Sequence, residues 1–509
     1  MIKLKSTAVP FVIGIVLTGI LGFVCPAISQ AAAHNDEEIS QQETASPRRR
    51  LLLPELAEEM SAHRNKQQKY AAVVDSTEKK RVAAAKNQTT KNQITLKTTN
   101  VKVEATKHHS EEQLRNLVPE LEKDTVNVGR LSHQIQLAND TGAVKIDTDF
   151  RRQSGDTYEV TLHAEDKKAE SWAVNVNNTG NDYTGNWRVG VTYMNRNFTG
   201  VDDTLGAAYV TSPGHFDEVK QAALFYRVNL PRAGDSLYAA YSWSDVDLGT
   251  IGNFSGLGIE ATGRGATVGV HYQHNFKYTK AHRQILDVGF DHKHYRNATS
   301  YSYSSRDINN STDYDVAAVS VSYADIRRSA GQYAAWSVGY TGNLNKDDGF
   351  LMNRPGSDSH FHLWKASANY QRRLPNDMIL GLRLSGQYSA QKTVTTEQFG
   401  AGGASSVRGF KERAAYADKG ISGSLELYSP ELWGAARFVA FVDYAKLRNN
   451  NPAPNEMSSG SLGSYGLGIR YNDKKSGLYA AVDYAHAFSN RANTVDNLRP
   501  WHITVGYNF

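Results

Sequence analysis

An arginine in a loop of small residues is the first candidate for chemistry in this sequence. Arg408 lies in the run 398-QFGAGGASSVRGFKE-412, which is rich in glycine and serine. A phosphate-binding loop would need Gly-Lys-Ser/Thr at the right spacing and a following helix, and the run predicts neither. A plain surface loop would give Arg408 no partner. The remaining interpretation is that Arg408 folds against a carboxylate, which a guanidinium can bind through two parallel hydrogen bonds.

Asp443 is the candidate carboxylate. It lies in a strand predicted over residues 437–447, in which side chains alternate between two faces. One face carries Phe438, Ala440, Val442 and Tyr444, and the other carries Val439, Phe441 and Asp443. If the first face points outward, Asp443 points into the space that the strands enclose, where it needs a cation. The sequence alone cannot establish that Arg408 supplies this cation.

Two pairs of histidines could bind a metal ion. They are His292 with His294 and His360 with His362, each pair on a single face of a strand. Ordinary lumen or rim histidines at alternate strand positions are the better interpretation. No nucleophile and base stand out as a catalytic arrangement. We therefore expect no enzyme activity, no metal site and no cofactor.

Strands must position these residues. From residue 169 to the C-terminus about sixteen segments alternate apolar and polar residues, each near the ~10 residues of a tilted membrane strand. The last segment places Trp501, Tyr507 and Phe509 on one face. A soluble sandwich or propeller would also alternate, but here aromatic residues recur at strand ends and the opposite face is polar. The pattern predicts an all-β transmembrane barrel of about 16 antiparallel strands over residues 169–509.

Composition agrees with this fold class. The 509 residues include 27 tyrosines and 41 glycines but only 13 prolines, which favours many strands over a helical core. The net charge of +5 is spread along the chain, so the sequence gives no case for nucleic-acid binding.

The N-terminal segment is predicted to be an export signal, residues 1–33. Lys3 and Lys5 precede an apolar run over residues 8–24, and small residues follow at 31–33. A single-pass anchor is the alternative, although the apolar run is short for a span. Cys25 is the only cysteine, so removal of the signal would leave no disulfide and no cysteine metal site. Residues 34–92 are predicted to form a charged spacer or an N-terminal helix.

Residues 93–168 predict one small α+β domain with the order β-α-α-β-β. Ser110 and Gln113 form a predicted capping box ahead of the first helix. Its apolar stripe comprises Leu114, Leu117, Val118 and Leu121. A second stripe follows from Val128 to Ala138, and two alternating strands complete the unit.

These features together resemble one family. The stretch Val407-Arg408-Gly409-Phe410 is similar to the VRGF/Y loop of the two-partner secretion transporters, the haemolysin/haemagglutinin secretion–activation proteins of the POTRA-barrel superfamily. Phe441-x-Asp443 resembles the F-x-D strand motif of this family, although Ala445 replaces the usual glycine. The small α+β unit resembles a POTRA domain, and the strand from Trp501 to Phe509 is similar to the family's closing strand. The family usually has two POTRA domains after a plug helix, whereas this sequence predicts one.

The resemblance implies a fold and a function. Residues 392–415 would form the sixth extracellular loop, between the eleventh and twelfth strands, and would fold into the lumen with Arg408 against Asp443. The barrel would lie in the outer membrane with the POTRA domain in the periplasm. It would passively export a large unfolded β-rich partner, a secreted β-helical protein. Outer-membrane lipids and a barrel-assembly machinery that reads the C-terminal strand would be the other partners.

Two other functions remain open. An insertase of outer-membrane barrels belongs to the same superfamily, but it would normally bring more POTRA domains. A general porin or adhesin barrel would explain the strands, but it would explain neither the POTRA unit nor the arginine loop.

Overall fold

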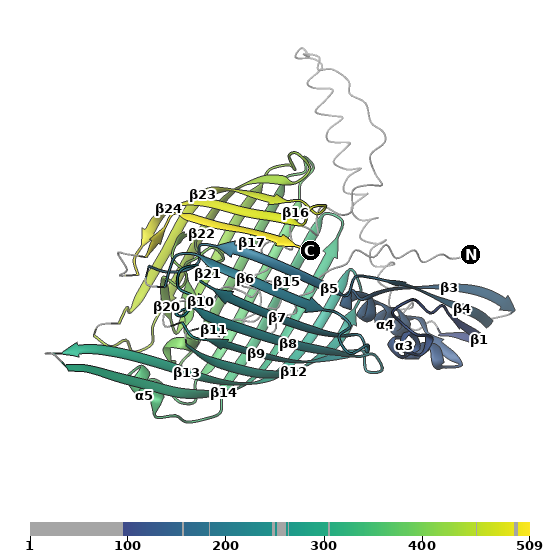
Figure 1. Ribbon diagram of the computed structural model, residues 1–509, viewed down its shortest axis with the longest axis horizontal. Helices are drawn as coiled ribbons and strands as arrows, with labels where there is room; N and C mark the ends of the chain where they lie inside the picture. The colour runs from purple at the N-terminus through teal and green to yellow at the C-terminus, as the bar shows by residue number, and fades with distance from the viewer. Residues whose placement is uncertain are drawn as a thin grey trace, which may run out of the picture.

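A small α+β domain and a closed barrel make up the described part of the chain (Figure 1). The computed structural model describes residues 95–509, apart from 155–156, 183, 247–249, 252–260, 263, 304–305, 455 and 493–496. The predicted export signal (1–33) and spacer (34–92) lie outside the described residues. Within the described residues, no helix is long and apolar enough to cross a membrane.

The small domain has the predicted α+β character with one additional strand. Its elements are β1 (Thr95–Val103), α3 (Glu111–Leu117), η1 (Pro119–Glu122), β2 (Thr125–Asn127), α4 (Val128–Thr141), β3 (Val144–Ser154) and β4 (Thr157–Asp166). The sheet order is β2-β1-β4-β3, in which β1 and β4 run parallel. The short strand β2 pairs with β1 through backbone groups, so side-chain alternation did not predict it.

The helix boundaries follow local rules. Ser110 and Gln113 form the predicted capping box at the start of α3. The predicted stripe continues to Leu121, but α3 ends at Leu117 because a residue before proline is disfavoured in helical conformation. Val118, which precedes Pro119, has φ −130° and ψ 58°. Gly142 ends α4 with φ +83°, a left-handed conformation suited to glycine.

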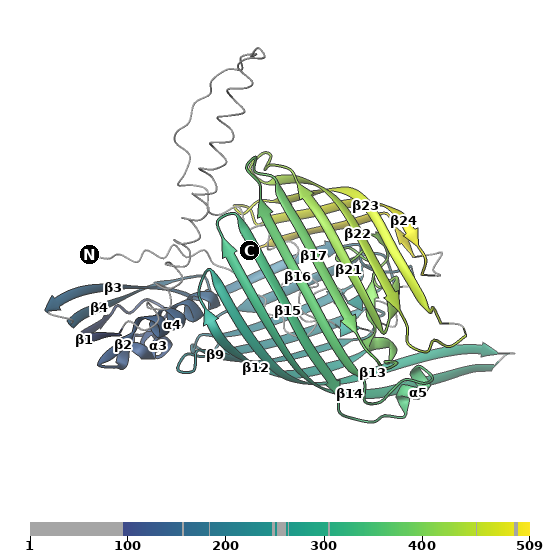
Figure 2. The ribbon, with the colours of Figure 1, turned by 180° about the vertical axis from the view of Figure 1, so that it is seen from behind.

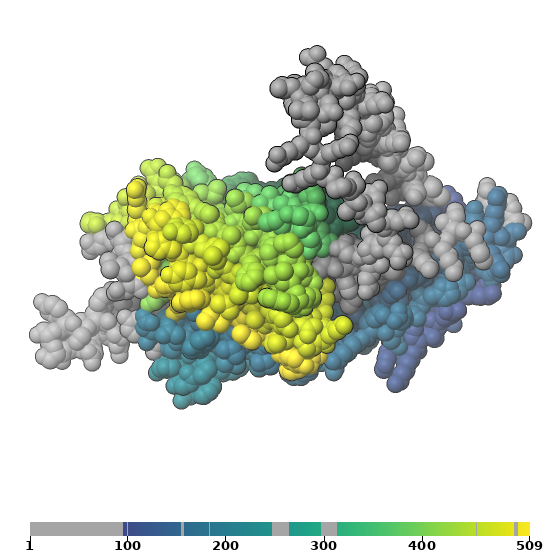
Figure 3. All heavy atoms as spheres, turned by 90° about the horizontal axis from the view of Figure 1, so that it is seen from above, coloured from purple at the N-terminus to yellow at the C-terminus, as the bar shows by residue number. Residues whose placement is uncertain are grey.

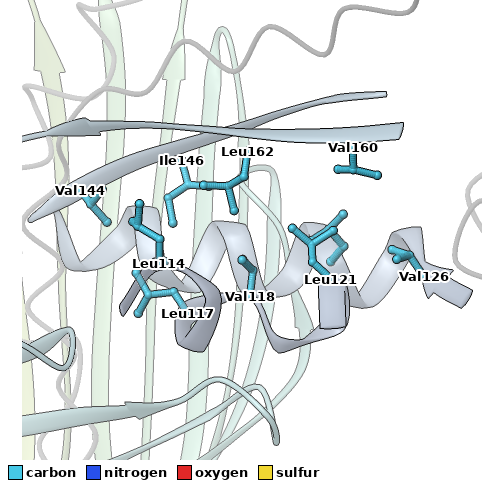
Figure 4. Packing of buried hydrophobic residues seen from close by; sticks show 11 residues of the cluster. Leu114, Leu117, Val118, Leu121, Val126, Val144, Ile146, Val160 and Leu162 are labelled. Atoms are coloured by element: carbon cyan, nitrogen blue, oxygen red, sulfur yellow. The ribbon is translucent and has the colours of Figure 1, made fainter. Parts of the chain in front are cut away.

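The two helices bury one face against the sheet of the small domain (Figure 4). Leu114, Val118, Val126, Ile146, Val160 and Leu162 are fully buried in this core. Full burial of such side chains contributes ~1.5–3 kcal/mol each relative to exposure. The domain therefore has a hydrophobic core of its own.

The barrel contains sixteen strands in one closed ring, which confirms the predicted architecture. The strands are β5 (Glu170–Asn177), β6 (Arg188–Asn195), β7 (Asp203–Thr211), β8 (Lys220–Leu230), β9 (Asp235–Ser244), β12 (Arg264–Tyr278), β13 (His282–Tyr303), β14 (Arg306–Ser329), β15 (Gln332–Asn343), β16 (His362–Arg373), β17 (Ile379–Tyr388), β21 (Lys419–Tyr428), β22 (Ala436–Arg448), β23 (Ser459–Asn472), β24 (Leu478–Asn490) and β26 (Trp501–Asn508). Figure 2 shows the wall from β12 to β17 from outside.

Short elements lie in the loops between the barrel strands. They are β10 (Thr250–Ile251), β11 (Ala261–Thr262), α5 (Gly349–Asn353), η2 (Thr395–Glu397), β18 (Phe399–Ala401), β19 (Gly409–Phe410), β20 (Ala415–Ala417) and β25 (Leu498–Arg499).

The last strand closes the ring against the first (Figure 3, yellow against blue). The β26–β5 register runs from Thr504 opposite Asn177 to Asn508 opposite Ala173. Asn178 extends this seam beyond the paired strands: its side chain donates to Trp501 O at 2.8 Å and accepts from Ile503 N at 2.9 Å. Closure satisfies the backbone groups of both edge strands, which an isolated edge in a bilayer could not do.

The two faces of the wall differ as predicted. Along β22, buried and exposed positions alternate without interruption from Val439 to Arg448. Phe438, Val442 and Tyr444 are 45–49% exposed on the outside, whereas Asp443 is fully buried. An apolar exterior around a polar interior is the arrangement of a membrane barrel.

The small domain packs through α4 against one end of the barrel, called here the near end. Leu137 packs into a buried cluster with Tyr278 and Ile285, and Asp140 forms an ion pair with Arg283 at 2.5 Å. The His133 ring stacks on Tyr278 with centroids 5.5 Å apart. The domain is therefore held by both apolar and charged contacts.

A buried carboxyl also lies at this junction. Asp202, in the turn between β6 and β7, accepts hydrogen bonds from Thr141 at 2.9 Å and from Asn229 at 3.0 Å. Burial raises the pKa of Asp202 to about 7.

Candidate functional site

The loop that connects β17 to β21, residues 389–418, is the candidate site and is called here the lumen loop. β17 and β21 are the eleventh and twelfth strands of the ring in chain order. Within the loop, β18 pairs with β20 to form a small antiparallel hairpin. At the turn of its tip, Gly402 has φ +109°, and a Cβ there would lie 2.6 Å from Lys411 O. Only glycine fits this position without displacement of the backbone.

Arg408 at the tip of the loop is bound to Asp443. Its side chain is 1% exposed, with Nε 2.7 Å from Asp443 Oδ2 and Nη2 2.7 Å from Asp443 Oδ1. The backbone N–H of Arg408 donates to the same carboxylate at 3.0 Å. Nη2 also donates to Ser424 Oγ at 2.9 Å. The two residues thus form the two-pronged contact that a guanidinium and a carboxylate favour.

Neighbouring strands complete the surroundings of Arg408. Ser424 and Glu426 of β21 lie opposite Asp443 and Phe441 of β22 in the register, so all four side chains point inward together. Arg408 Nη1 lies 2.9 Å from Glu426 Oε1. The guanidinium carbon lies 3.4 Å from the centre of the Phe441 ring, which is a cation–π contact.

The inner wall of the barrel around Arg408 carries more carboxylates than arginines. Glu426 also pairs with Arg383 at 3.1 Å, and Asp483 pairs with Arg470 at 2.8 Å. Together with Asp443, the wall offers three carboxylates and two arginines. Arg408 supplies the third positive charge, so the loop neutralises a wall that would otherwise hold an unpaired buried charge.

The residues after Arg408 bind the closing side of the barrel. Gly409 has φ +92° and donates its N–H to His502 Nε2 at 3.0 Å, so that nitrogen carries no proton. Gly409 and Phe410 form β19, which pairs with Leu498 and Arg499 of β25. Val407 and Phe410 are fully buried in an apolar cluster with Ala445, Leu462 and others. The whole stretch 407–410 is therefore fixed inside the barrel.

The predicted C-terminal residues lie apart from this site. Trp501, Tyr507 and Phe509 are 52%, 41% and 53% exposed on the outer face. Phe509 N donates to Trp172 O at 2.9 Å, which extends the seam to the end of the chain. These residues belong to the closure of the barrel, whereas His502 of the same strand reaches the loop.

Ion pairs also hold the other end of the lumen loop. Arg354, in the loop between β15 and β16, binds Asp418 at 2.5 Å and Glu456 at 2.8 Å. Lys392 binds Glu456 at 2.9 Å. Burial disfavours the charge of Glu456, but the hydrogen bonds from Arg354, Ala453 N and Lys392 lower its pKa to about 2. Three connecting loops are thus tied together at the end of the barrel opposite the small domain, the far end.

Three histidines of the two candidate pairs lie near other polar side chains. His294 Nδ1 lies 2.8 Å from Asp315, and His362 Nδ1 lies 2.7 Å from the Tyr340 hydroxyl. His292 lies 3.9 Å from Asp315 and is about half exposed. Among the residues that the structure describes, no group of three or more His, Cys, Asp or Glu could hold a metal ion.

Sequence reasoning identified Arg408, Asp443 and Phe441 but missed their neighbours. Ser424, Glu426, Asp483 and His502 contribute to the site from three other strands. Alternation along β21 would have placed Glu426 inward, because Leu425 and Leu427 are outward-facing apolar residues. The register that brings Glu426 to Arg408 was not available from the sequence.

The family model and the relatives that match this chain are described as secretion or transporter proteins. A family model described as haemolysin secretion/activation protein ShlB/FhaC/HecB matches residues 156–471, more than half of the chain. The heme/hemopexin transporter protein HuxB of Haemophilus influenzae is 26% identical over 351 residues, 66% of this chain. The chain spans 60% of the length of the HuxB relatives that it matches. The outer membrane transporter CdiB of Dickeya dadantii is 31% identical over 115 residues, 22% of this chain and 20% of that protein.

Solved structures share the fold. CdiB from Escherichia coli superposes with a TM-score of 0.64 at 18% identity, over 81% of this chain and 76% of that one. BamA from Haemophilus ducreyi lacking POTRA domains 1–3 superposes with a TM-score of 0.54 at 15% identity, over 81% and 85%. At these identities the likeness concerns the fold alone.

Proposed function

This chain belongs to the haemolysin secretion/activation protein family, and from that premise we propose that it exports a large unfolded β-rich partner protein by two-partner secretion. The observation that carries the proposal is the family match over residues 156–471, the region that contains both Arg408 and Asp443. The family is one of secretion transporters rather than of enzymes.

The barrel lies in the outer membrane, with the POTRA domain on its periplasmic side. The near end is therefore periplasmic, and the far end, with the lumen loop, is extracellular. The exposed apolar face of the wall meets the lipids. The strand that ends at Phe509 would be the element that a barrel-assembly machinery reads during insertion.

The POTRA domain would capture the client by strand addition at β3. This strand forms one edge of the sheet and pairs only with β4 among the described residues (Figure 1). It is eleven residues long, whereas β2 at the other edge has three. An extended client that pairs with β3 would be held through its backbone, which suits a long partner of variable sequence.

The lumen would conduct the client after capture. Arg408 holds the tip of the lumen loop on Asp443, and this contact would keep the tip in a defined position during transport. Folding of the client outside the cell would bias its movement outward. A secreted β-helical protein would be the partner.

Depletion of the protein in its own host tests the proposal. Loss of one secreted β-rich protein from the cell surface, with other outer-membrane proteins unchanged, is the expected result. A broad loss of outer-membrane barrels would instead indicate an insertase, and an unchanged surface proteome would refute both functions. Re-expression of the wild-type chain should restore the lost protein and serves as the control.

A further inference from the structure

The lumen loop is attached to two opposite walls of the barrel. Its tip binds β24 and β26, through Asp483 and His502. Its first limb binds β13 and β14, through η2. In ring order β13 and β14 are the seventh and eighth strands, and β24 and β26 are the fifteenth and sixteenth. Strands eight places apart in a ring of sixteen face each other, so the loop crosses the lumen.

The attachment at η2 centres on one ion pair. Lys293 Nζ of β13 lies 2.7 Å from Glu397 Oε1, and the Tyr295 hydroxyl donates to the same oxygen at 3.1 Å. Beside it, Tyr314 OH lies 2.9 Å from Thr396 Oγ1. The Glu397 side chain is 4% exposed and that of Lys293 is 19% exposed. The pair therefore lies within the barrel rather than on its surface.

The attachment of the loop tip at Arg408 and the attachment of η2 at Glu397 differ in the number of contacts that hold them. Arg408 has a two-pronged contact with Asp443, a second carboxylate in Glu426 and an aromatic ring beneath it. Glu397 has one direct ion pair, with Lys293 at 2.7 Å, whereas Lys365 acts on it only through its charge, and Lys293 is the more exposed partner of that pair. Multiple charge-assisted hydrogen bonds to one group are harder to break than a single one. The η2 attachment is therefore the weaker of the two.

We propose that Lys293 and Glu397 form a second anchor that holds the lumen loop across the pore, and that this anchor breaks to open a conducting path while Arg408 stays bound. Both are positioning residues for the loop. The inference rests on the proposed function in taking the lumen as the route of the client. It goes beyond that function by naming the contact that changes.

Ion conductance of the purified full chain in planar bilayers tests the anchor without any client. Lys293→Gln and Glu397→Gln should each raise the open probability at least roughly tenfold, the factor expected from one charge-assisted hydrogen bond. The exchange K293E/E397K restores the pair in reverse and should return conductance to the wild-type level. Lys446→Gln is the matched control, because Lys446 is exposed on the outer face of β22.

Two further measurements distinguish release of the η2 attachment from misfolding of the barrel or loss of the whole loop. Heat-modifiable migration in gels should remain normal in all variants, because the ring of strands is untouched. Trypsin should still not cleave after Arg408 in Lys293→Gln, because the tip stays buried. Cleavage at Arg408 would mean that the whole loop has left the lumen, and it would overturn the proposal.

Two other conductance results would contradict the proposed anchor. If both single variants conduct like Lys446→Gln, or if the exchanged pair conducts like the single variants, the anchor does not exist as proposed. Export measured in the same strains addresses the proposed function separately. A conductance that follows the anchor, in a protein that never exports a partner, would leave the anchor standing and refute the export function.

Discussion

Replacement of Arg408 by alanine should abolish most export while the barrel still inserts. The change removes the guanidinium that neutralises Asp443, and it leaves three carboxylates, two of which still have ion pairs with Arg383 and Arg470. Asp443 is fully buried beside Arg408, so without the guanidinium its charge would lie in a weakly solvated place with no ion-pair partner among the described residues. The loop tip should therefore lose its defined position in the lumen.

The size of the effect follows from the geometry. Removal of one partner of a buried ion pair costs ~3–5 kcal/mol. The backbone N–H of residue 408 can still donate to Asp443, as it does now at 3.0 Å, which favours the lower value. A loss of ~3 kcal/mol lowers the ratio of docked to undocked loop roughly a hundredfold. Arg408→Lys should be intermediate, because an ammonium keeps the charge but lacks the planar fork.

Export is assayed as the amount of the partner protein at the cell surface and in the medium, and insertion as heat-modifiable migration of the outer-membrane fraction. Arg448→Ala is a suitable control, because Arg448 is exposed at the extracellular end of β22. Trypsin should cleave the extracellular loops of Arg408→Ala faster than those of the wild type.

Wild-type export by Arg408→Ala, with normal insertion, would refute the reasoning. It would mean that the contact with Asp443 stabilises the fold but has no part in transport. A failure of insertion would show instead that the pair is needed for assembly, and Arg408→Lys would then decide between the two roles.

Three further predictions concern other parts of the molecule. Burial lowers the pKa of His133 below 6.5, against the opposing effect of its hydrogen bond to Gly234 O, so the docked POTRA domain holds the neutral ring. As pH falls through 6.5, His133 should take up a proton in the undocked form before it does so in the docked form, so docking of the POTRA domain should weaken. Limited proteolysis measures docking as a function of pH, and His133→Gln should make it less dependent on pH. Asn178→Ala removes two hydrogen bonds at the seam and should cost ~1–3 kcal/mol, measured as a lower temperature of barrel unfolding in detergent gels. Leu114→Ala should destabilise the POTRA core by ~2–5 kcal/mol, seen as faster proteolysis of that domain in the intact chain with an unchanged barrel.

Much of the fold was predictable because its determinants are local. The side-chain period of two distinguishes the outer and inner faces of each strand, and it placed Asp443 and Phe441 inward. Ser110 and Gln113 predicted the start of α3 by their spacing. Its end was mispredicted, because the apolar stripe continues past Pro119 while the backbone at Val118 does not remain helical.

Contacts between distant strands were not predictable. Glu426 reaches Arg408 only through the register of β21 against β22, and Asp483 and His502 reach it only after the ring closes. Lys293 and Glu397 are 104 residues apart and lie in elements that no local pattern connects. Such pairs depend on how many strands close the ring and in which register.

By itself, the sequence determined which segments become strands, which face of each turns to the lipid and which loop carries an arginine among small residues. These properties follow from alternation and residue type within a few positions of the chain. Only the tertiary structure decided which charges surround Arg408 and that the lumen loop spans opposite walls. The physical reason is that both depend on closure of the ring, which pairs residues hundreds of positions apart.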